Sequence, residues 1–213
     1  MIAVLRSKPH FILAYNGCDR ETGEEALRCD GPEGLVASDN GYDWLGTGVY
    51  FWETDPRRAL QWAEIKHQDH VRREKEKGTP VALRRPFVVG AIVNLGMCLD
   101  LTTVEGVSLL KEGYGSYLDD FKKLQKKKPE LTLPQNDEKT GKMYLDYQVI
   151  NHTCRSYEEE MDQSIDTVRA LIPEGDFVYP GGSFKDKTHT QICVRKQRAI
   201  IAYFRMRDMG LGS

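Results

Sequence analysis

Long hydrophobic runs are missing from this 213-residue chain, and so is an excess of charge of either sign. No run of about 18 apolar residues occurs, and the first residues lack a basic segment followed by an apolar core. We therefore expect neither a signal peptide nor a membrane span, and a cytoplasmic location. Thirty basic and 32 acidic residues give a net charge of -2, which disfavours a polyanion-binding surface over the whole chain but not a local basic patch.

Motifs for metals and nucleoside triphosphates are also lacking. The five cysteines are scattered, odd in number and without a Cys-x-x-Cys spacing, which disfavours both a disulfide framework and a zinc knuckle. No Gly-x-x-x-x-Gly-Lys-Ser/Thr loop is present, and Gly46-Thr47-Gly48 precedes an expected strand rather than a helix. We expect no bound metal.

What the chain does contain is typical of one globular domain. Apolar residues make up 40% of the sequence and charged residues 29%. At this length about 70% of the surface of the unfolded chain can be buried, so a core forms without disulfides or metals. We expect a single domain over residues 1–213.

Alternating strand and helix signals predict an α+β fold with strands near both ends of the sequence. Asp55-Pro56 is a strong helix start, Gly78 a stop, and Thr22 a candidate cap for an earlier short helix. Two helical segments are expected between Tyr144 and Leu171. The remaining expected elements are a helix over 104–128 and strands over 11–15, 48–52, 87–94, 97–101, 189–194 and 199–204, with a turn at Leu95-Gly96.

Three ordered segments carry a more specific pattern. The first is Tyr15-Asn16-Gly17-Cys18. The second is Gly34-Leu35 with Leu45-Gly46-Thr47-Gly48-Val49-Tyr50-Phe51, followed by a helix with Trp62. The last is His189-Thr190-Gln191-Ile192-Cys193-Val194-Arg195. Together they resemble the nicotinamide-binding half and the last catalytic strand of the poly(ADP-ribose) polymerase-like ADP-ribosyltransferases, most closely small bacterial members. The resemblance covers about Phe11 to Phe204 and implies a central split antiparallel sheet with flanking helices.

The resemblance also implies a function. It suggests NAD-dependent mono-ADP-ribosyl transfer to a macromolecule, which could be RNA, DNA or protein, with NAD as co-substrate. Several of the similar bacterial proteins are toxins or phage-defence effectors, so an antitoxin protein is an expected partner.

The cofactor-binding residues implied by the resemblance are Tyr15, Gly17, Cys18, Gly48, Tyr50 and Trp62. Tyr50 would stack on the nicotinamide and Trp62 would form the other wall. Gly17 would let the backbone approach the carboxamide, with Cys18 nearby. The simpler alternatives are that Tyr50 and Trp62 are aromatic residues of the core, that Gly17 is a turn glycine, and that Cys18 is a packed thiol.

Two of the catalytic positions depart from the family. Asn16 stands where the family has a histidine that binds ribose hydroxyls, and Gln191 stands where it usually has glutamate. Glutamine orients hydroxyls but does not titrate, which favours single transfer over chain elongation. Glu53 is a candidate for the missing base, or else an acid at the end of a strand. Gln191 could also be a strand residue without a role.

Acceptor binding is expected from the loop that precedes the Gln191 strand, through Phe184, Lys185 and Lys187. An aromatic side chain beside cations suits single-stranded nucleic acid, whereas a solvated charged face is the simpler alternative.

Three rival functions remain open. The chain could be an inert module that binds NAD or ADP-ribose, an NAD glycohydrolase, or an RNA phosphotransferase of the same fold. Asn16 itself has two interpretations: a natural variant with altered activity, or a replacement that disarms a toxin.

Overall fold

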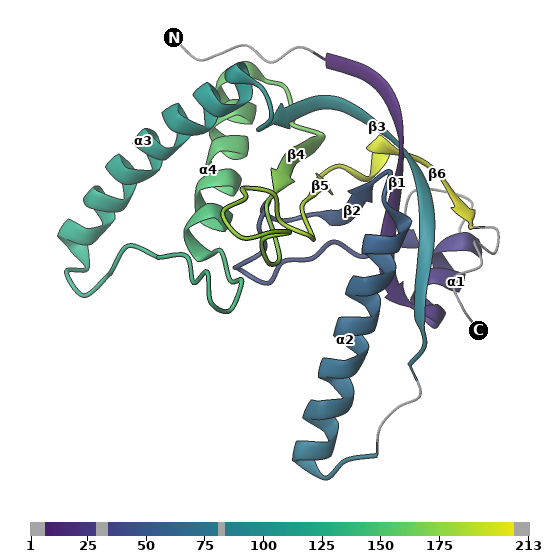
Figure 1. The fold of residues 1–213 in the computed structure, drawn as a ribbon. Coiled ribbons are helices and arrows are strands. Elements are labelled where there is room, and N and C mark those ends of the chain that lie inside the picture. Colours follow the sequence, from purple (N-terminus) through teal and green to yellow (C-terminus); the bar gives the residue numbers. More distant parts are fainter. Residues whose placement is uncertain (1–6, 29–33, 81–83, 207–213) are drawn as a thin grey trace.

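A computed structural model describes residues 7–28, 34–80 and 84–206, with the side chains of residues 7–10 left out of the description (Figure 1). Within these residues the strands are β1 (Ser7–Asp19), β2 (Val49–Glu53), β3 (Pro86–Asp100), β4 (Thr167–Ile172), β5 (His189–Val194) and β6 (Ile200–Arg205). The helices are α1 (Arg20–Arg28), α2 (Pro56–Lys77), α3 (Val104–Lys127) and α4 (Tyr144–Met161), with a 3-10 turn at Gln197–Ala199. The α+β class is confirmed.

The six strands form one mixed sheet in the order β1-β2-β5-β4-β3-β6, and β1 also pairs with β3. The five strands β1, β2, β5, β4 and β3 therefore close a circuit of pairings, and β6 extends the free edge of β3. The expectation of an antiparallel sheet is wrong for one pair, because β3 and β4 run parallel. Parallel neighbours need a long crossover, which α3 and α4 supply here.

Strand β3 is longer than expected because the chain does not turn back at Leu95-Gly96. Gly96 has a positive φ of 55°, and the register between β1 and β3 shifts opposite this point, between Lys8 and Phe11. The sequence signal for a turn thus corresponds to an irregularity within one strand. Beyond it, Met97 still pairs with Ser7 of β1, and Cys98 to Asp100 pair with β4.

The ends of α2 match the sequence prediction. The Asp55 carboxylate accepts a hydrogen bond from the Arg58 backbone N–H at 2.9 Å, Pro56 occupies the first turn, and Gly78 ends the helix with a φ of 67°. The cap of α1 is not Thr22 but Asp19, whose carboxylate accepts from the Thr22 N–H at 3.3 Å.

The prediction of a second helical segment before Leu171 is wrong. Helix α4 ends at Asp162, whose φ is 51°, and residues 167–172 form β4. Buried Val168, Ala170 and Ile172 alternate with more exposed residues, so the side chains follow the period of a strand.

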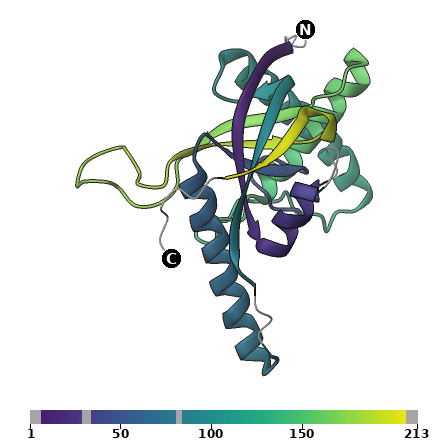
Figure 2. The ribbon, with the colours of Figure 1, turned by 90° about the vertical axis from the view of Figure 1, so that its right-hand side faces the viewer.

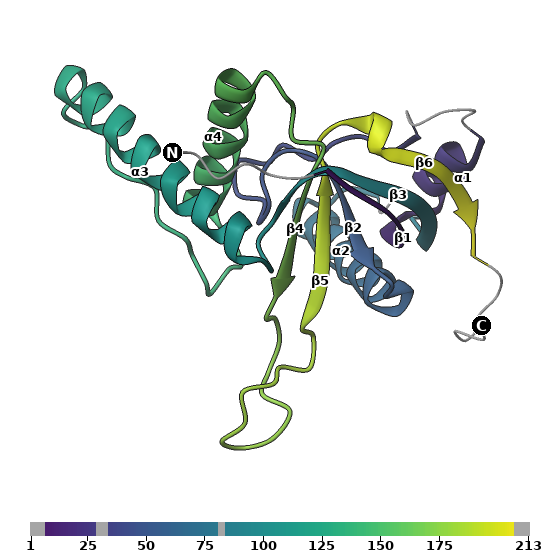
Figure 3. The same cartoon turned by 90° about the horizontal axis from the view of Figure 1, so that it is seen from above.

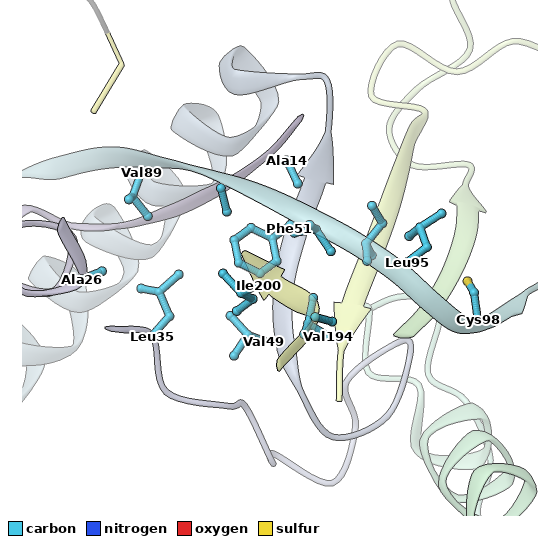
Figure 4. Packing of buried hydrophobic residues seen from close by; sticks show 14 residues of the cluster. Ala14, Ala26, Leu35, Val49, Phe51, Val89, Leu95, Cys98, Val194 and Ile200 are labelled. Carbon is cyan, nitrogen blue, oxygen red and sulfur yellow. The ribbon is translucent and has the colours of Figure 1, made fainter. Parts of the chain in front are cut away.

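Two large clusters of buried side chains hold the sheet. One contains Phe51 and Val89, and Figure 4 shows the Phe51 ring beside Val49 and Ile200. The other lies where α3 and α4 cover the sheet and contains Leu99, Leu109, Ile150 and Tyr157. In the described residues, no helix is both long and apolar enough to cross a membrane.

Helix α2 approaches β1 closely enough to require a glycine. A methyl group at Gly17 would lie 1.9 Å from the Ala59 carbonyl oxygen, a distance that no side chain can adopt. The far half of α2 extends away from the sheet in both Figure 1 and Figure 2. Helix α2 therefore contacts β1 through its first turns, at Ala59 and Ala63.

Candidate functional site

A cleft of about 760 Å³ opens beside β1, β2 and β5, with α2 and the segment before β2 as further walls. The residues that the sequence predicted for a site and that line this cleft are Asn16, Gly17, Cys18, Gly48, Tyr50, Trp62 and Gln191. Tyr15, Glu53, Phe184, Lys185 and Lys187 are not among the lining residues.

Strand pairing explains why segments so distant in sequence meet. Strand β2 lies between β1 and β5, and Trp52 pairs with Tyr15 on one side and with Gln191 on the other. The first and last of the three sequence segments are thus separated by one strand. The convergence depends on long-range pairing, because 175 positions separate Asn16 from Gln191.

Asn16 ties two walls of the cleft together. Its side-chain amide donates a hydrogen bond to the Tyr50 backbone carbonyl at 2.8 Å. The side chain is half-buried, so part of it faces the cleft. A residue at this position can therefore influence both the spacing of β1 and β2 and any molecule bound beside Tyr50.

Tyr50 is held from its hydroxyl end. The hydroxyl donates to the Gly46 carbonyl at 2.6 Å and accepts from the Leu45 N–H at 2.9 Å. Burial, the largest influence, raises the pKa of the Tyr50 phenol far above its usual range, so the group stays neutral. The chemistry available to Tyr50 is therefore a fixed aromatic surface rather than proton transfer.

The aromatic partner of Trp62 in the structure is Trp52. The two ring centroids lie 6.0 Å apart with an interplanar angle of 47°, and Trp62 is 37% exposed whereas Trp52 is buried. Tyr50 and Trp62 both line the cleft, as the sequence predicted, but Trp52 lies between the strand and the helix. Sequence reasoning missed Trp52, although it follows Tyr50 by two residues and so shares its face of the strand.

His189 is a second cleft residue that sequence reasoning missed. Its Nδ1–H donates to the Lys187 carbonyl at 2.7 Å, and its ring lies 5.9 Å from that of Trp52. Burial is the main reason that the pKa of His189 is lowered, so the neutral ring is favoured. His189 and Gln191 share one face of β5, and that spacing of two was the available signal.

The structure contradicts the role predicted for Glu53. Its carboxylate is paired with Arg169 through hydrogen bonds of 2.6 and 3.2 Å, and Arg169 also lies 3.3 Å from Asp100. The side chain lies on the opposite face of β2 from Tyr50 and Trp52, because successive strand residues alternate. Glu53 links β2 to β4 and is not a base at the cleft.

Tyr15, Gly17 and Gly48 have structural explanations. Tyr15 is buried with its ring edge-on to Phe204, at 6.1 Å between centroids, and it is not at the cleft surface. Gly17 is required by the approach of α2, and a methyl group at Gly48 would lie 2.5 Å from the Cys193 sulfur. For both glycines, packing against the protein itself accounts for the residue.

Cys18 borders the cleft as a protonated thiol. Burial, together with the negative charge of Asp19, raises the pKa of the Cys18 thiol to about 12. Since the thiolate is the nucleophilic form, Cys18 is poorly suited to covalent catalysis.

The loop from which acceptor binding is expected, between β4 and β5, forms a hairpin that projects from the body of the molecule (Figures 2 and 3). The Val178 N–H donates to the Phe184 carbonyl at 2.9 Å, and the Lys185 ammonium lies 5.7 Å from the centre of the Phe177 ring. Phe184 is 69% exposed. The structure does not bring Phe184, Lys185 or Lys187 to the cleft lining, although the hairpin leads directly into β5.

Fold and site together define an α+β protein with a mixed six-stranded sheet and a cleft between three of its strands and a helix. No protein-family model matches the chain, and no solved structure matches it. An uncharacterized protein from Methanocaldococcus jannaschii is 26% identical over 200 residues, covering 87% of this chain and 83% of that protein. The identity is too low to assign a family, and the relative carries no functional description.

Proposed function

We propose that the chain is an NAD-dependent mono-ADP-ribosyltransferase. The observation that supports this proposal is the convergence of Asn16, Tyr50 and Gln191, from three strands, on one cleft that also receives Trp62. The resemblance in sequence requires this meeting. The 760 Å³ volume falls in the usual range for small-molecule and cofactor sites.

In this proposal the Tyr50 ring packs against the nicotinamide and Gln191 hydrogen-bonds the adjoining ribose. The glycosidic bond breaks with its electron pair going to nicotinamide, which leaves as a neutral molecule. The oxocarbenium-like ribose is then captured by a nucleophile of the acceptor, which loses its proton. Because residue 191 does not titrate, transfer of one ADP-ribose unit is the expected outcome.

Asn16 is the natural position for a test. The protein and its Asn16→His variant are titrated with NAD by calorimetry, and nicotinamide release is measured on both. A histidine reaches further than asparagine and supplies a ring nitrogen for a ribose hydroxyl, so we expect release to rise at least tenfold. Tyr50→Ala in the same background removes the ring and should abolish binding, whereas Lys126→Ala, at the far end of α3, should change neither quantity.

The rival functions give distinct results in the same experiment. Binding of NAD without release in either protein identifies an inert binding module. Release that continues without a macromolecular acceptor identifies a glycohydrolase. Transfer of phosphate from RNA to NAD, without loss of nicotinamide, identifies a phosphotransferase. Absence of NAD binding in both proteins would remove the basis of the proposal.

A role as a bacterial toxin or anti-phage effector, controlled by an antitoxin, belongs to the same proposal. Its only support is the resemblance to bacterial members with those roles. Expression of the Asn16→His variant in bacteria tests it, and unimpaired growth with active enzyme in the cells would count against toxicity.

A further inference from the structure

Four exposed cations line one wall of the same cleft. Lys66 lies at the middle of α2 and Arg73 in its last turns, and Arg84 and Arg85 precede β3. None of the four forms an ion pair with a carboxylate in the described part of the chain. In a chain with a net charge of -2, such a group is a local concentration of positive charge.

The carboxylates that line the cleft already have other partners. Asp69 pairs with Arg72 at 2.8 Å, and Glu174 pairs with Arg58 at 2.6 Å. The carboxylate of Asp43 accepts from the Ser38 hydroxyl, and that of Asp19 caps α1. Asp69 and Glu174 are thus neutralised by arginines, whereas Asp43 and Asp19 accept from uncharged donors and keep their negative charge. Among the described lining residues, the four cations of the wall therefore outnumber the carboxylates that no arginine or lysine neutralises.

An aromatic side chain is part of the same wall. Trp62 precedes Lys66 by four residues and Arg73 follows Lys66 by seven, so all three occupy one face of α2. Seven residues of helix correspond to about 10 Å along the axis. The Lys66 ammonium lies 6.0 Å from the centre of the Trp62 ring, and 37% of Trp62 is exposed.

We infer that single-stranded nucleic acid docks along this wall, with its phosphates on Lys66, Arg73, Arg84 and Arg85 and a base on Trp62. A row of cations beside an exposed aromatic ring is the arrangement that binds single strands without sequence preference. The inference rests on the proposed function for one step only, the transfer of ADP-ribose to the docked strand. According to this inference, the macromolecule that accepts ADP-ribose is a nucleic acid rather than a protein.

Docking here would place the strand beside the reacting residues. Trp62 and Gln191 line the same cleft as the cations, so a strand held on the wall has a direct path to the ribose site. The projecting hairpin, where the sequence analysis placed the acceptor, lies outside that lining. The wall therefore takes the role that the sequence analysis gave to Phe184, Lys185 and Lys187.

The test is a binding measurement that needs no NAD. The fluorescence anisotropy of labelled 12-residue oligo(U) and oligo(dT) is followed against the full chain at 50 to 200 mM salt. With four phosphates neutralised, log K should fall against log salt with a slope of about -3. Arg73→Glu combined with Arg84→Glu should weaken binding at least tenfold, and Trp62→Leu about fivefold.

The matched control reverses two charges elsewhere. Lys126→Glu with Lys127→Glu makes the same change in net charge at the end of α3, far from α2 (Figures 1 and 3), and should alter affinity less than twofold. Circular dichroism establishes that each variant is folded. A preference for oligo(U) or oligo(dT) would support docking in either case and would identify the sugar of the acceptor.

Three results would overturn the inference. They are no binding by the unmodified chain at 50 mM salt, equal weakening by the control pair, and displacement of the oligonucleotide by polyglutamate at equal charge concentration. A separate calorimetric titration with NAD distinguishes the two proposals. Oligonucleotide binding without NAD binding would leave docking intact and remove the transferase, and the reverse would remove docking alone.

Discussion

Two arginines, one half-buried and one buried, connect distant parts of this molecule in different ways. Arg169 on β4 donates to Glu53, Asp100 and the Thr102 hydroxyl, so its whole guanidinium is occupied. Arg58 on α2 is only 4% exposed and has one acceptor, Glu174, while its Nε and Nη1 have no partner among the described residues.

Further unpartnered atoms lie near Arg58. Glu174 lies 3.8 Å from His189, and the His189 ring contacts Trp52. His189 Nε2 and Trp52 Nε1 are buried without a hydrogen-bond partner in the described part of the protein. Each such group costs free energy, which a region selected for stability alone would avoid. The contrast indicates that the Arg169 cluster maintains the fold, while the Arg58 cluster, beside the cleft, is shaped by another requirement.

The largest effect should come from removing Arg169. In Arg169→Met the carboxylates of Glu53 and Asp100, 17% and 5% exposed, lose a shared cation, and we expect a loss of about 3 kcal/mol in the free energy of unfolding. Urea denaturation measures it. Arg198→Met, which removes an exposed pair with Asp166, is the control and should cost well under 1 kcal/mol. Similar losses in the two variants would show that the Arg169 cluster has no special role.

Replacing Glu53 by glutamine keeps the shape of the side chain and removes its charge. We expect the free energy of unfolding to fall by about 1.5 kcal/mol, because a charge-assisted hydrogen bond becomes a neutral one. Affinity for NAD in the calorimetric titration should stay within twofold, since Glu53 does not line the cleft. A selective loss of nicotinamide release with normal stability would restore Glu53 as a catalytic base.

Arg58→Met should change stability less than either of these. The variant loses one ion pair but also removes two buried nitrogens without partners, so we expect a change within about 1 kcal/mol. The same urea series gives the value. A loss equal to that of Arg169→Met would mean that the two clusters are energetically equivalent, and the comparison would fail.

The smallest effect concerns pH. Burial lowers the pKa of His189 in the folded protein below its usual 6.5, so under that pH the unfolded chain binds more protons. His189 should therefore reduce stability as the pH falls from 7.5 through 6.5 toward the lower, folded-state pKa. His189→Gln lacks this loss, and its urea midpoint should vary less between pH 7.5 and 5. Parallel curves for the two proteins would show that His189 titrates normally.

Local signals in the sequence predicted much of the fold. Asp55-Pro56 and Gly78 define α2 because capping is a property of a few adjacent residues. Period-two alternation could have placed Trp52 with Tyr50 and Glu53 on the other face, so the error at Glu53 was avoidable. The cap at Asp19 was missed because Asp19 and Thr22, three positions apart, are both residue types that cap helices.

Other features had no local signal. Arg169 and Glu53 are 116 positions apart, and no sequence pattern near either residue predicts that the two form an ion pair. The approach of α2 to Gly17 also had no local signal. Gly17 was predicted to contact a ligand, but the close packing of α2 explains the glycine. The meeting of Asn16, Tyr50 and Gln191 could be predicted only from the order of the elements, on the assumption that strands from the two ends of the sequence lie close together in the sheet.

The hairpin between β4 and β5 has a consequence for how this protein can diversify. Its base is fastened by Arg58 to Glu174 and by His189 to Lys187, while Phe177, Tyr179 and Phe184 near the tip are more than half exposed. Exposed residues contribute little to stability, so the tip can accept insertions and new sequences while the frame beneath it is unchanged. The sequence of this hairpin can therefore change between related chains, and new contacts can arise there, while the fold stays the same.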